Sequence, residues 1–438
     1  MQNVNYILCA DYILTMNSQM DVIKQGAIAV DANKIIDLGS KEEILKKYSA
    51  NKIFDKKNHV IMPGLINTHT HAAMVYFRGI ADDLLLKEWL EQHIWPVEKK
   101  MLSPNFVYDA TKLACLEMLK GGITTFVDMY FYESHVAKAT KKMQMRGVIG
   151  PTILNFATAA AKDNKEYLAN AERFILEWKG DRLIIPQIAP HSLYACDLTI
   201  LKDVIKLARK HDAPLHIHLS EPEWEPGFVL EKTGKRPVEY LLDIGFFEGI
   251  TTAAHGIWLT DNEIEILAKH NVGVSHCVES NLKMAAGFAP VVKMVNAGVK
   301  VTFGTDSAVS NNDLNIFSEM SLAAKLHKTL EKDPTALKAK TVLTMATKIA
   351  ADSLGMGDKL GILEKDYLAD LICINLKTPH SVPLYDIYSH LVYAACATDV
   401  ETVMIDGKLI LDNRMTLSCS EDDIINTALE WQGKIINN

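Results

Sequence analysis

The sequence predicts an α/β protein with a (β/α)8 barrel in the middle of the chain and a small β domain that both termini share. The first observation is that eight short apolar or β-branched runs recur in the middle, each followed by an amphipathic stretch. The second is that the segments before and after this region have the pattern of short strands joined by turns. The third is size, because 438 residues, 48% of them hydrophobic and 23% charged, provide a sizeable core.

The β domain is predicted from both ends of the chain. Near the N-terminus, "NYILCADYILTM" and "QGAIAVDANKIIDLG" have strand patterns, and Asp-Ala-Asn separates two apolar runs in the latter. Towards the C-terminus, "YLADLICINL" is typical of a strand, and "TVMIDGKLILDN" is typical of a hairpin with its turn at Asp406-Gly407. The predicted domains are therefore residues 1–58 and 366–438 for the β domain and residues 59–365 for the barrel.

The eight runs of the middle region have the spacing of a barrel. They are "NHVIMPGLINTH", "ITTFVDM", "RGVIGPTIL", "RLIIPQIAP", "APLHIHL", "ITTAAHG", "NVGVSHC" and "VKVTFGTD". From His71 to Asp306, 235 residues span seven intervals, or about 34 per unit, close to the roughly 31 per unit of a barrel of about 250 residues. Helical patterns with Asp caps, such as "DLTILKDVIKLARKHD" and "DNEIEILAKHN", lie between the runs. An open doubly wound sheet is the alternative, but it needs no such regular count, and its glycine-rich nucleotide loop is missing from the first βα turn.

Charge and composition exclude some classes of binding partner and indicate the cellular compartment of the protein. The net charge is −8 and no long run of Lys or Arg occurs, so nucleic acid and anionic membrane surfaces are not expected as partners. No segment approaches about 18 consecutive apolar residues, and the N-terminal stretch lacks the basic start of a signal peptide. Seven scattered cysteines without a CxxC pair are typical of reduced thiols, which predicts a cytoplasmic protein.

Ionisable and metal-binding side chains stand at the end of nearly every predicted barrel strand, where barrel enzymes carry out their chemistry. In strand order these residues are His69 and His71, Asp128, His191, His216, His218 and Glu221, His255, His276, and Asp306. A single histidine in such a place is more often an ordinary hydrogen-bonded residue. Several of them at one barrel mouth are hard to explain by packing, because buried polar groups must be paired. A divalent cation would satisfy several imidazoles and one carboxylate together.

The donor set narrows the choice of metal. The predicted ligands are His69, His71, His218 and Asp306. Imidazole nitrogens with one carboxylate oxygen suit zinc, with iron as second choice, whereas Mg²⁺ and Ca²⁺ prefer oxygen-rich sites. Four such ligands leave a position for water, which is typical of a catalytic site. For His216, His276 and Asp128 we expect a supporting role within the protein instead.

Four strand-end motifs, "PGLINTHTH", "HLSE", "AAHG" and "GTDS", stand in the order found in the amidohydrolase superfamily, which the chain resembles. The resemblance is closer to the 5-methylthioadenosine/S-adenosylhomocysteine deaminases. It runs through "GGITTFVDMYFY", "IWPVEKKMLSP", "ESNLKMAAGFAPV", "GTDSAVSNNDLNIFSEMSLAA" and "LGILEKDYLADLICINL" and covers essentially the whole chain. That family combines a distorted (β/α)8 TIM barrel with a β-sandwich built from both termini, so the resemblance implies this fold.

The resemblance also implies a reaction and catalytic roles. The reaction is hydrolytic deamination at C6 of the adenine ring of a 5′-modified adenosine, by attack of hydroxide carried by one Zn²⁺ per subunit, with Fe²⁺ as the alternative metal. The four predicted ligands would hold the metal. Glu221 would be the proton shuttle and His255 the partner of the reactive water. Asp306 would help to orient that water, and both carboxylates would contact the substrate.

Three more residues are implied on the substrate side. Glu98 in "WPVEK" would hold the ribose hydroxyls, His191 would contact the substrate, and Trp95 would wall the adenine or thioether pocket. By residue type alone, Glu98 would be a solvated helix carboxylate, and Trp95 could equally be a core residue. The implied partner is thus a small adenine nucleoside, and the sequence leaves a homo-oligomer open.

The chain departs from the family pattern in two places. Members that accept S-adenosylhomocysteine are expected to place basic side chains near the end of strand three. Here Arg146 stands before that strand, and only Lys162 follows it nearby. In addition, "HCVE" replaces the more usual "HNPT", so that Glu279 adds negative charge at the rim. The sequence therefore leaves the 5′ substituent of the substrate open.

Alternative functions come from two classes. Other hydrolases of the superfamily, acting on adenosine, aminofutalosine, guanine, cytosine or triazines, use much the same metal motifs, although Glu98 favours a ribosyl substrate. A binuclear cyclic amidase is set aside, because "IAPHS" offers no lysine for carboxylation. A non-catalytic barrel scaffold would be expected to have lost metal ligands, and this chain keeps all four.

Overall fold

The computed structural model describes residues 1–80, 82–84 and 89–437, with the backbone alone for residues 89–91. The chain forms two compact units. The first comprises Met1–Ile66, Met118–Thr125 and Asn315–Cys419, and the second comprises Asn67–Glu117, Phe126–Leu314 and Ser420–Asn438. The domain boundaries predicted after residues 58 and 365 stay predictions.

The first unit is built on an eight-stranded sheet to which both ends of the chain contribute. The strand order is β17-β16-β15-β14-β4-β1-β2-β3. The strands are β1 (Gln2–Leu14), β2 (Val22–Asp31), β3 (Lys34–Ser40), β4 (Tyr48–Pro63), β14 (Leu371–Asn375), β15 (Val400–Ile405), β16 (Lys408–Asp412) and β17 (Met415–Thr416). β1 and β4 pair in parallel and the other neighbours are antiparallel. This confirms the predicted β domain shared by the termini.

Turn chemistry and burial explain why these segments pair. The β15–β16 turn has Asp406 at φ 53° and Gly407 at φ 71°, the left-handed conformation that a two-residue hairpin of type I′ needs at both positions. A Cβ on Gly407 would lie 2.0 Å from the Ala32 carbonyl oxygen, so only glycine fits. Leu8 and Leu371, from opposite ends of the chain, belong to one buried hydrophobic cluster.

The helices of this unit are α1 (Lys41–Lys47), α13 (Ile316–Glu331), α14 (Ala339–Met345), α15 (Lys348–Ser353), α16 (Ile387–Tyr393) and the 3₁₀ turn η3 (Ala397–Asp399).

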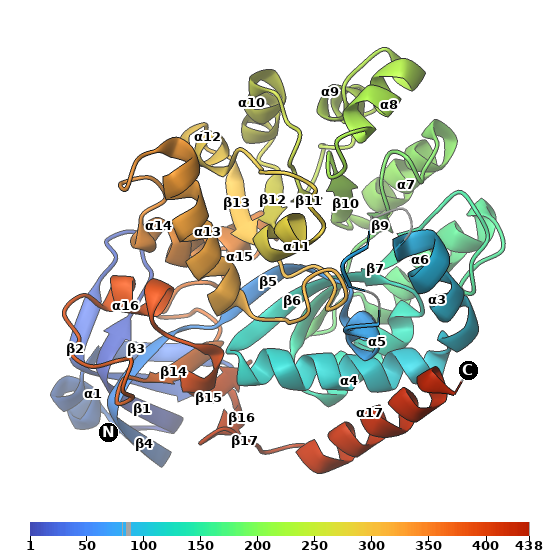
Figure 1. Ribbon diagram of the computed structural model, residues 1–438. Coiled ribbons are helices and arrows are strands. Elements are labelled where there is room, and N and C mark those ends of the chain that lie inside the picture. Colours follow the sequence, from blue (N-terminus) through green and yellow to red (C-terminus); the bar gives the residue numbers. More distant parts are fainter. Residues whose placement is uncertain (81, 85–88, 438) are drawn as a thin grey trace. The chain divides into compact units, whose positions relative to one another are not determined.

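The second unit contains the C-terminal ends of the barrel strands (Figure 1). In chain order the strands are β5 (Leu65–Thr70), β6 (Ile123–Tyr130), β7 (Arg146–Ile153), β8 (Ile184–Pro186) with β9 (Ala189–Pro190), β10 (Leu215–Leu219), β11 (Thr251–His255), β12 (Gly273–His276) and β13 (Lys300–Phe303). They form two sheets, β5-β6-β7-β8 with β9 on β7, and β10-β11-β12-β13. Single parallel bridges, Thr70 with Asp306 and Ile188 with Leu215, join the two sheets. The predicted distorted barrel is therefore confirmed, and its distortion lies where the ladder narrows to one bridge.

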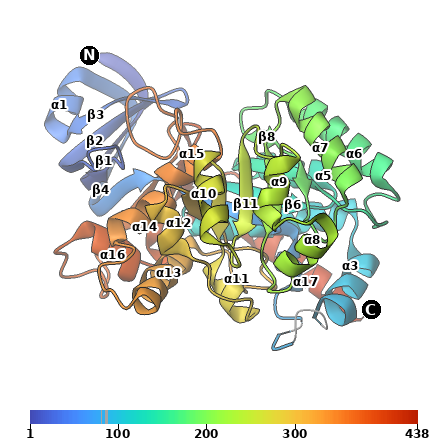
Figure 2. The same cartoon turned by 90° about the horizontal axis from the view of Figure 1, so that it is seen from above.

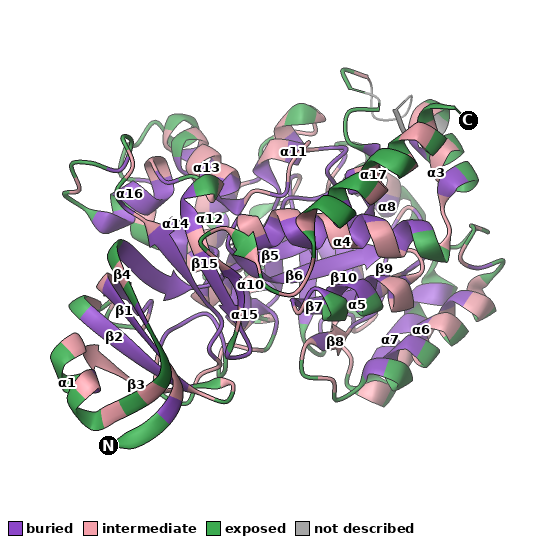
Figure 3. Cartoon of the chain, turned by 90° about the horizontal axis from the view of Figure 1, so that it is seen from below, coloured by how far each residue is buried: buried purple, intermediate pink, exposed green. Residues whose placement is uncertain are grey.

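The helices of the second unit run between the barrel strands, except α17, which follows β17. They are η1 (Ala72–Phe77), η2 (Trp89–Ile94), α3 (Trp95–Met101), α4 (Pro104–Lys120), α5 (Glu133–Lys142), α6 (Asn164–Trp178), α7 (Leu198–His211), α8 (Glu225–Thr233), α9 (Pro237–Asp243), α10 (Asp261–Lys269), α11 (Val278–Lys283), α12 (Val291–Asn296) and the C-terminal α17 (Glu421–Ile436). α6 and α7 lie side by side (Figures 1 and 2), each with a buried and an exposed face (Figure 3).

Helix capping follows the sequence pattern with one change. The Asp197 side chain accepts hydrogen bonds from the backbone N–H groups of Thr199 and Ile200 in the first turn of α7, as the sequence pattern predicts. In α10 the cap is Thr260 rather than Asp261, because Thr260 and Glu263 form a capping box. At the end of the chain, Trp431 of α17 packs edge-on against Phe106 of α4. No helix in the described part of the chain is long and apolar enough to cross a membrane.

Candidate metal centre and active site

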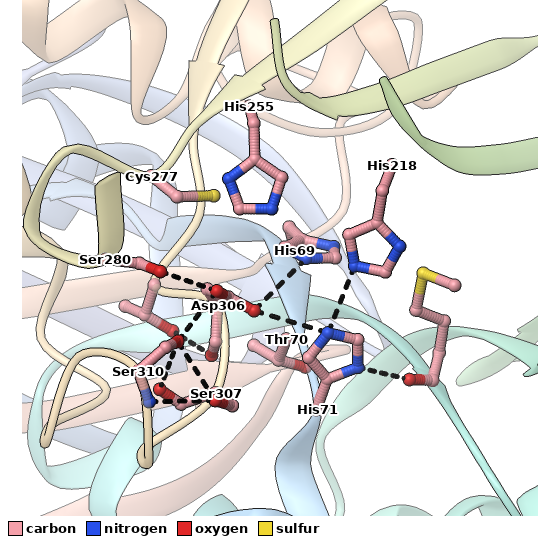
Figure 4. Close-up of polar contacts among 12 residues, drawn as sticks. His69, Thr70, His71, His218, His255, Cys277, Ser280, Asp306, Ser307 and Ser310 are labelled. Carbon is pink, nitrogen blue, oxygen red and sulfur yellow. Dashed lines mark hydrogen bonds and ion pairs between the residues drawn. The ribbon is translucent and has the colours of Figure 1, made fainter. Parts of the chain in front are cut away.

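Four of the predicted site residues meet at the C-terminal ends of β5, β10 and β13 (Figure 4). His69 lies on β5, and His71 directly follows the last residue of that strand, Thr70. His218 comes from β10, and Asp306 follows β13. One ligand atom of each of these four residues lies within 4.8 Å of the others. His71 Nε2 is 3.2 Å from both Asp306 Oδ1 and His218 Nε2.

Backbone carbonyls fix the orientation of two of these imidazoles. His71 Nδ1 donates to the Met129 carbonyl oxygen at 2.6 Å, and His218 Nδ1 donates to the His191 carbonyl oxygen at 2.8 Å. A carbonyl oxygen can only accept, so the ring proton is on Nδ1 in both cases. The Nε2 lone pair of each ring then faces the cluster, which is the arrangement that metal-binding histidines need.

His69 is supported by a second imidazole in the layer below. Its Nδ1 lies 2.8 Å from His216 Nε2, and His216 Nδ1 lies 2.7 Å from the Thr252 hydroxyl. Both rings are fully buried. These contacts agree with the predicted supporting role of His216, which stays a prediction.

Two serine hydroxyls hold the carboxylate of the cluster. Asp306 Oδ2 accepts from Ser280 Oγ at 2.6 Å and from Ser310 Oγ at 2.7 Å, while Oδ1 faces His69 and His71. Asp306 also has a left-handed backbone, with φ at 59°, a conformation that is uncommon for residues other than glycine. The sequence analysis missed both serines, because a hydroxyl beside a motif is no signal of its own.

The four residues fit a divalent cation. His69 Nε2 is buried without a hydrogen-bond partner. Burial lowers the pKa of His69 to about 4, and burial with the neighbouring imidazoles holds the pKa of His218 well below its usual range. Burial opposes protonation of His71, but the Asp306 carboxylate outweighs it and raises the His71 pKa to about 9. The cluster thus has neutral nitrogens, one carboxylate and one proton that a metal ion would replace.

Glu221 and His255 stand beside this cluster. Glu221 Oε1 is 3.8 Å from His255 Nε2, and burial raises the pKa of Glu221. His255 Nδ1 lies 2.9 Å from the side-chain oxygen of Asn281, so this nitrogen carries the ring proton. The His255 Nε2 is buried without a hydrogen-bond partner, and its ring centroid is 5.5 Å from that of His69. The unpartnered His255 nitrogen and the Glu221 carboxyl group therefore lie 3.8 Å apart beside the four-residue cluster.

The residues implied for substrate binding take different positions. The Tyr130 hydroxyl at the end of β6 donates to Glu98 Oε1, and burial raises the Glu98 pKa to about 7. Glu98 is therefore not a freely solvated carboxylate, and Tyr130 is a partner that the sequence analysis missed. The His191 ring lies 4.5 Å from the His218 ring, centroid to centroid. Trp95 is 47% exposed, which excludes a core role.

Asp128 and His276 lie outside the four-residue cluster. Asp128 Oδ1 accepts from the Thr70 hydroxyl at 2.7 Å and from the Ala72 backbone N–H at 2.6 Å, so it ties the segment after β5 to β6. His276 is buried at the end of β12. The predicted supporting role of Asp128 agrees with these contacts.

The two departures from the family pattern also have defined places. Arg146 is buried at the first residue of β7, and its Nη1 donates to the Arg182 carbonyl oxygen at 2.6 Å. Lys162 is exposed in the segment after β7. Burial, together with the Asp313 charge, raises the pKa of Glu279 to about 7. The negative charge expected from Glu279 is therefore reduced near neutral pH.

A (β/α)8 barrel that carries three imidazoles and a carboxylate at its mouth, with a buried glutamate beside them, defines a metal-dependent hydrolase. More specifically, the chain belongs to the amidohydrolase family, whose family model matches residues 60–410.

Relatives and solved structures match over nearly the whole chain. A 5-methylthioadenosine/S-adenosylhomocysteine deaminase of Thermodesulfovibrio yellowstonii is 50% identical over 99% of each chain. A 5′-deoxyadenosine deaminase of Methanosarcina acetivorans is 42% identical over 95% of each chain. The crystal structure of an adenosine deaminase from Xanthomonas campestris with bound zinc is 36% identical over 100% of both chains, with a TM-score of 0.98.

Proposed function

We propose that this chain is an aminohydrolase that deaminates the adenine ring of a 5′-modified adenosine, giving the inosyl product and ammonia. The observation that carries this proposal is the convergence of four ligand atoms within 4.8 Å of one another, beside Glu221 and His255. Relatives named for 5-methylthioadenosine, S-adenosylhomocysteine and 5′-deoxyadenosine support the substrate class. We propose one Zn²⁺ per chain, since zinc suits this donor set and is bound in the Xanthomonas campestris structure, with Fe²⁺ as the second choice.

Each residue then has a chemical task. The metal, when bound, supplies a Lewis acid that lowers the pKa of water towards about 7. Glu221 is protonated more readily than an ordinary glutamate, because burial raises its pKa, and it delivers a proton to N1 of the adenine ring. His255 Nε2 and Asp306 orient the attacking water. Asp306 accepts the proton of that water and passes it to the departing amine. The Ser280 and Ser310 hydroxyls meanwhile donate to Asp306 Oδ2 and hold the carboxylate in place.

Glu98 is proposed to bind the ribose hydroxyls. Its carboxylate is already oriented by the Tyr130 hydroxyl, and the Tyr130 ring lies 6.3 Å from the His71 ring, centroid to centroid. Glu98 therefore stands near the metal cluster and favours a nucleoside over a free base. His191 contacts the base and Trp95 walls the pocket in this proposal.

The 5′ substituent is proposed to be uncharged. Arg146 is buried at the start of β7 and already bonded to a carbonyl oxygen, so it is not available for the amino-acid carboxylate of S-adenosylhomocysteine. We therefore expect 5-methylthioadenosine or 5′-deoxyadenosine to be better substrates. We also propose a reducing, cytoplasmic setting, since none of the seven cysteines is in a disulfide in the described structure.

A spectrophotometric screen tests the function. The purified, zinc-loaded protein would be assayed for the adenine-to-hypoxanthine shift with adenosine, 5-methylthioadenosine, 5′-deoxyadenosine, S-adenosylhomocysteine and aminofutalosine, and for ammonia release from guanine. We expect turnover of the 5′-modified adenosines and little turnover of guanine. Absence of ammonia from every nucleoside would contradict the proposal, and turnover of guanine alone would favour a nucleobase deaminase.

A further inference from the structure

A second group of metal-binding side chains lies in the first unit and shares no residue with the barrel centre. His380 stands in the segment between β14 and α16. Cys396 directly precedes the short turn η3, and Asp399 is the last residue of that turn. One ligand atom of each residue lies within 4.8 Å of the other two. His380 Nε2 is 2.8 Å from Asp399 Oδ2. A nitrogen, a sulfur and an oxygen donor from two separate segments thus converge on one point.

The carboxylate at the centre of this group is held in place, while the other two donors are open to solvent. Asp399 is 3% exposed, and its Oδ2 also accepts the backbone N–H of Cys396 at 2.9 Å. The His380 side chain is 42% exposed. Of the seven cysteines, Cys396 is the one that is exposed. An ion from solution can therefore reach the imidazole and the thiol without opening the fold.

A buried imidazole stands beside the group. His390 on α16 is 8% exposed, and its Nε2 has no hydrogen-bond partner. The Asp399 and His380 charges both act on its pKa, which burial lowers. An unpartnered buried nitrogen is costly. Asp399 could be present only to cap the η3 turn. That role would not explain why an unpartnered His390 nitrogen stands beside the nitrogen, sulfur and oxygen donors of this group.

We propose that His380, Cys396 and Asp399 form a second metal site, for a borderline-soft divalent ion of the Zn²⁺ class. Imidazole and thiolate ligands suit such an ion, whereas Mg²⁺ and Ca²⁺ avoid thiolates. On binding, the Cys396 thiol loses its proton to solvent as the sulfur–metal bond forms. His380 binds through Nε2 with its proton on Nδ1, and gives up its hydrogen bond to Asp399. Water completes the coordination. The ion would tie the segment after β14 to the η3 turn.

Cobalt titration of the zinc-loaded enzyme tests this site. The four ligands of the barrel centre include no thiolate, so a thiolate-to-cobalt charge-transfer band reports the second site specifically. We expect wild-type protein, freed of excess metal, to bind one further equivalent of Co²⁺ with this band. Cys396→Ser should abolish the band and the extra equivalent, and His380→Ala should weaken binding at least tenfold. Cys419→Ser, which changes another partly exposed thiol, is the matched control and should behave like wild type.

The deaminase assay on the same samples separates this proposal from the proposed function. All three variants should keep wild-type turnover and melting temperature without added metal, because none of them changes the barrel centre. No additional equivalent in the wild type would overturn the second site, as would a band that persists in Cys396→Ser. A band lost instead in Cys277→Ser would place the thiolate at the end of β12, in the barrel, and would also overturn it.

Discussion

Buried polar groups at the barrel mouth in the second unit and in the sheet of the first unit differ in whether they have hydrogen-bond partners. At the mouth, His69 Nε2, His255 Nε2 and Glu225 Oε1 are buried without hydrogen-bond partners. Each such unpaired buried group costs stability, by about 1–3 kcal/mol.

In the sheet, the buried and half-buried polar groups named next, which join its strands, are paired. Asp370 Oδ1 accepts the Asp406 backbone N–H at 2.7 Å. Lys56 Nζ lies 2.8 Å from Asp412 Oδ1, and His59 Nε2 is near Glu401 as well. This difference indicates that the mouth is arranged for a ligand and the sheet for stability. Substitutions at the mouth should therefore change catalysis more than folding, and substitutions in the sheet should do the reverse.

The largest expected effect is that of Glu221→Gln. Because the amide cannot deliver a proton to the adenine ring, kcat should fall by about 10³-fold or more, equivalent to about 4 kcal/mol in the barrier. Zinc content and melting temperature should stay at wild-type values, since Glu221 is not one of the four ligands. Steady-state kinetics and metal analysis measure the two effects. Glu223→Gln, on an exposed neighbour, is the control, and a variant at position 221 with more than a tenth of wild-type turnover would remove Glu221 from the mechanism.

Leu371→Ala tests whether a substitution in the sheet changes stability without changing catalysis. Leu371 is fully buried in the cluster that joins both ends of the chain, so the cavity should lower the free energy of unfolding by about 3 kcal/mol. The kcat and KM of the remaining folded protein should not change. Denaturant unfolding and active-site-normalised kinetics would show this. Lys408→Ala, an exposed position in the same sheet, should change stability by less than about 0.5 kcal/mol; a changed KM in Leu371→Ala would mean that the sheet is not a purely structural region.

Much of the fold and of the candidate site could be predicted from the sequence, because it depends on local sequence patterns. The spacing of His69 and His71 at the end of one strand predicts a shared site, and Asp406-Gly407 fixes a hairpin turn. Strand ends of a closed barrel all point to one mouth, so His218 and Asp306 could be assigned to the same place without knowing any distance. The family resemblance added roles that residue type alone did not give, most clearly for Glu98.

The rest depends on contacts between segments that no local pattern encodes. Ser280 on α11 and Ser310 in the segment after β13 both hold Asp306. Asn281, also on α11, orients His255. Tyr130 belongs to a strand whose pattern indicates only burial, yet its hydroxyl reaches Glu98 on α3. Such residues are chosen by the geometry around the site, and they become visible only when the chain is folded.

A smaller effect is expected for Tyr130→Phe, which removes the hydroxyl that donates to Glu98. Loss of one hydrogen bond to a charged group should raise KM for the nucleoside about tenfold and leave kcat nearly unchanged. That bond favours the ionised carboxylate, so its loss should raise the Glu98 pKa further and move the acidic limb of the kcat/KM profile to higher pH. Tyr132→Phe, whose hydroxyl instead donates to the Ala159 carbonyl oxygen, is the control. An unchanged KM and pH profile would separate Tyr130 from ribose binding.

The smallest effect is expected in the pH dependence of stability, through Glu225 beside the mouth. This side chain is fully buried, and burial, with the Glu221 and Glu263 charges, raises its pKa to about 8. A carboxyl whose pKa is higher in the folded than in the unfolded chain stabilises the fold below the unfolded pKa, and this stabilisation is lost as the pH rises towards about 8. Glu225→Gln keeps the neutral form at every pH, so its unfolding free energy relative to wild type should increase by roughly 1 kcal/mol between pH 6 and pH 7. Denaturant midpoints across this range measure the effect, with Glu231→Gln on the exposed face of α8 as the control. Parallel pH curves for Glu225→Gln and wild type would show that the buried carboxyl at the mouth is satisfied after all, and would weaken the contrast with the paired groups of the sheet.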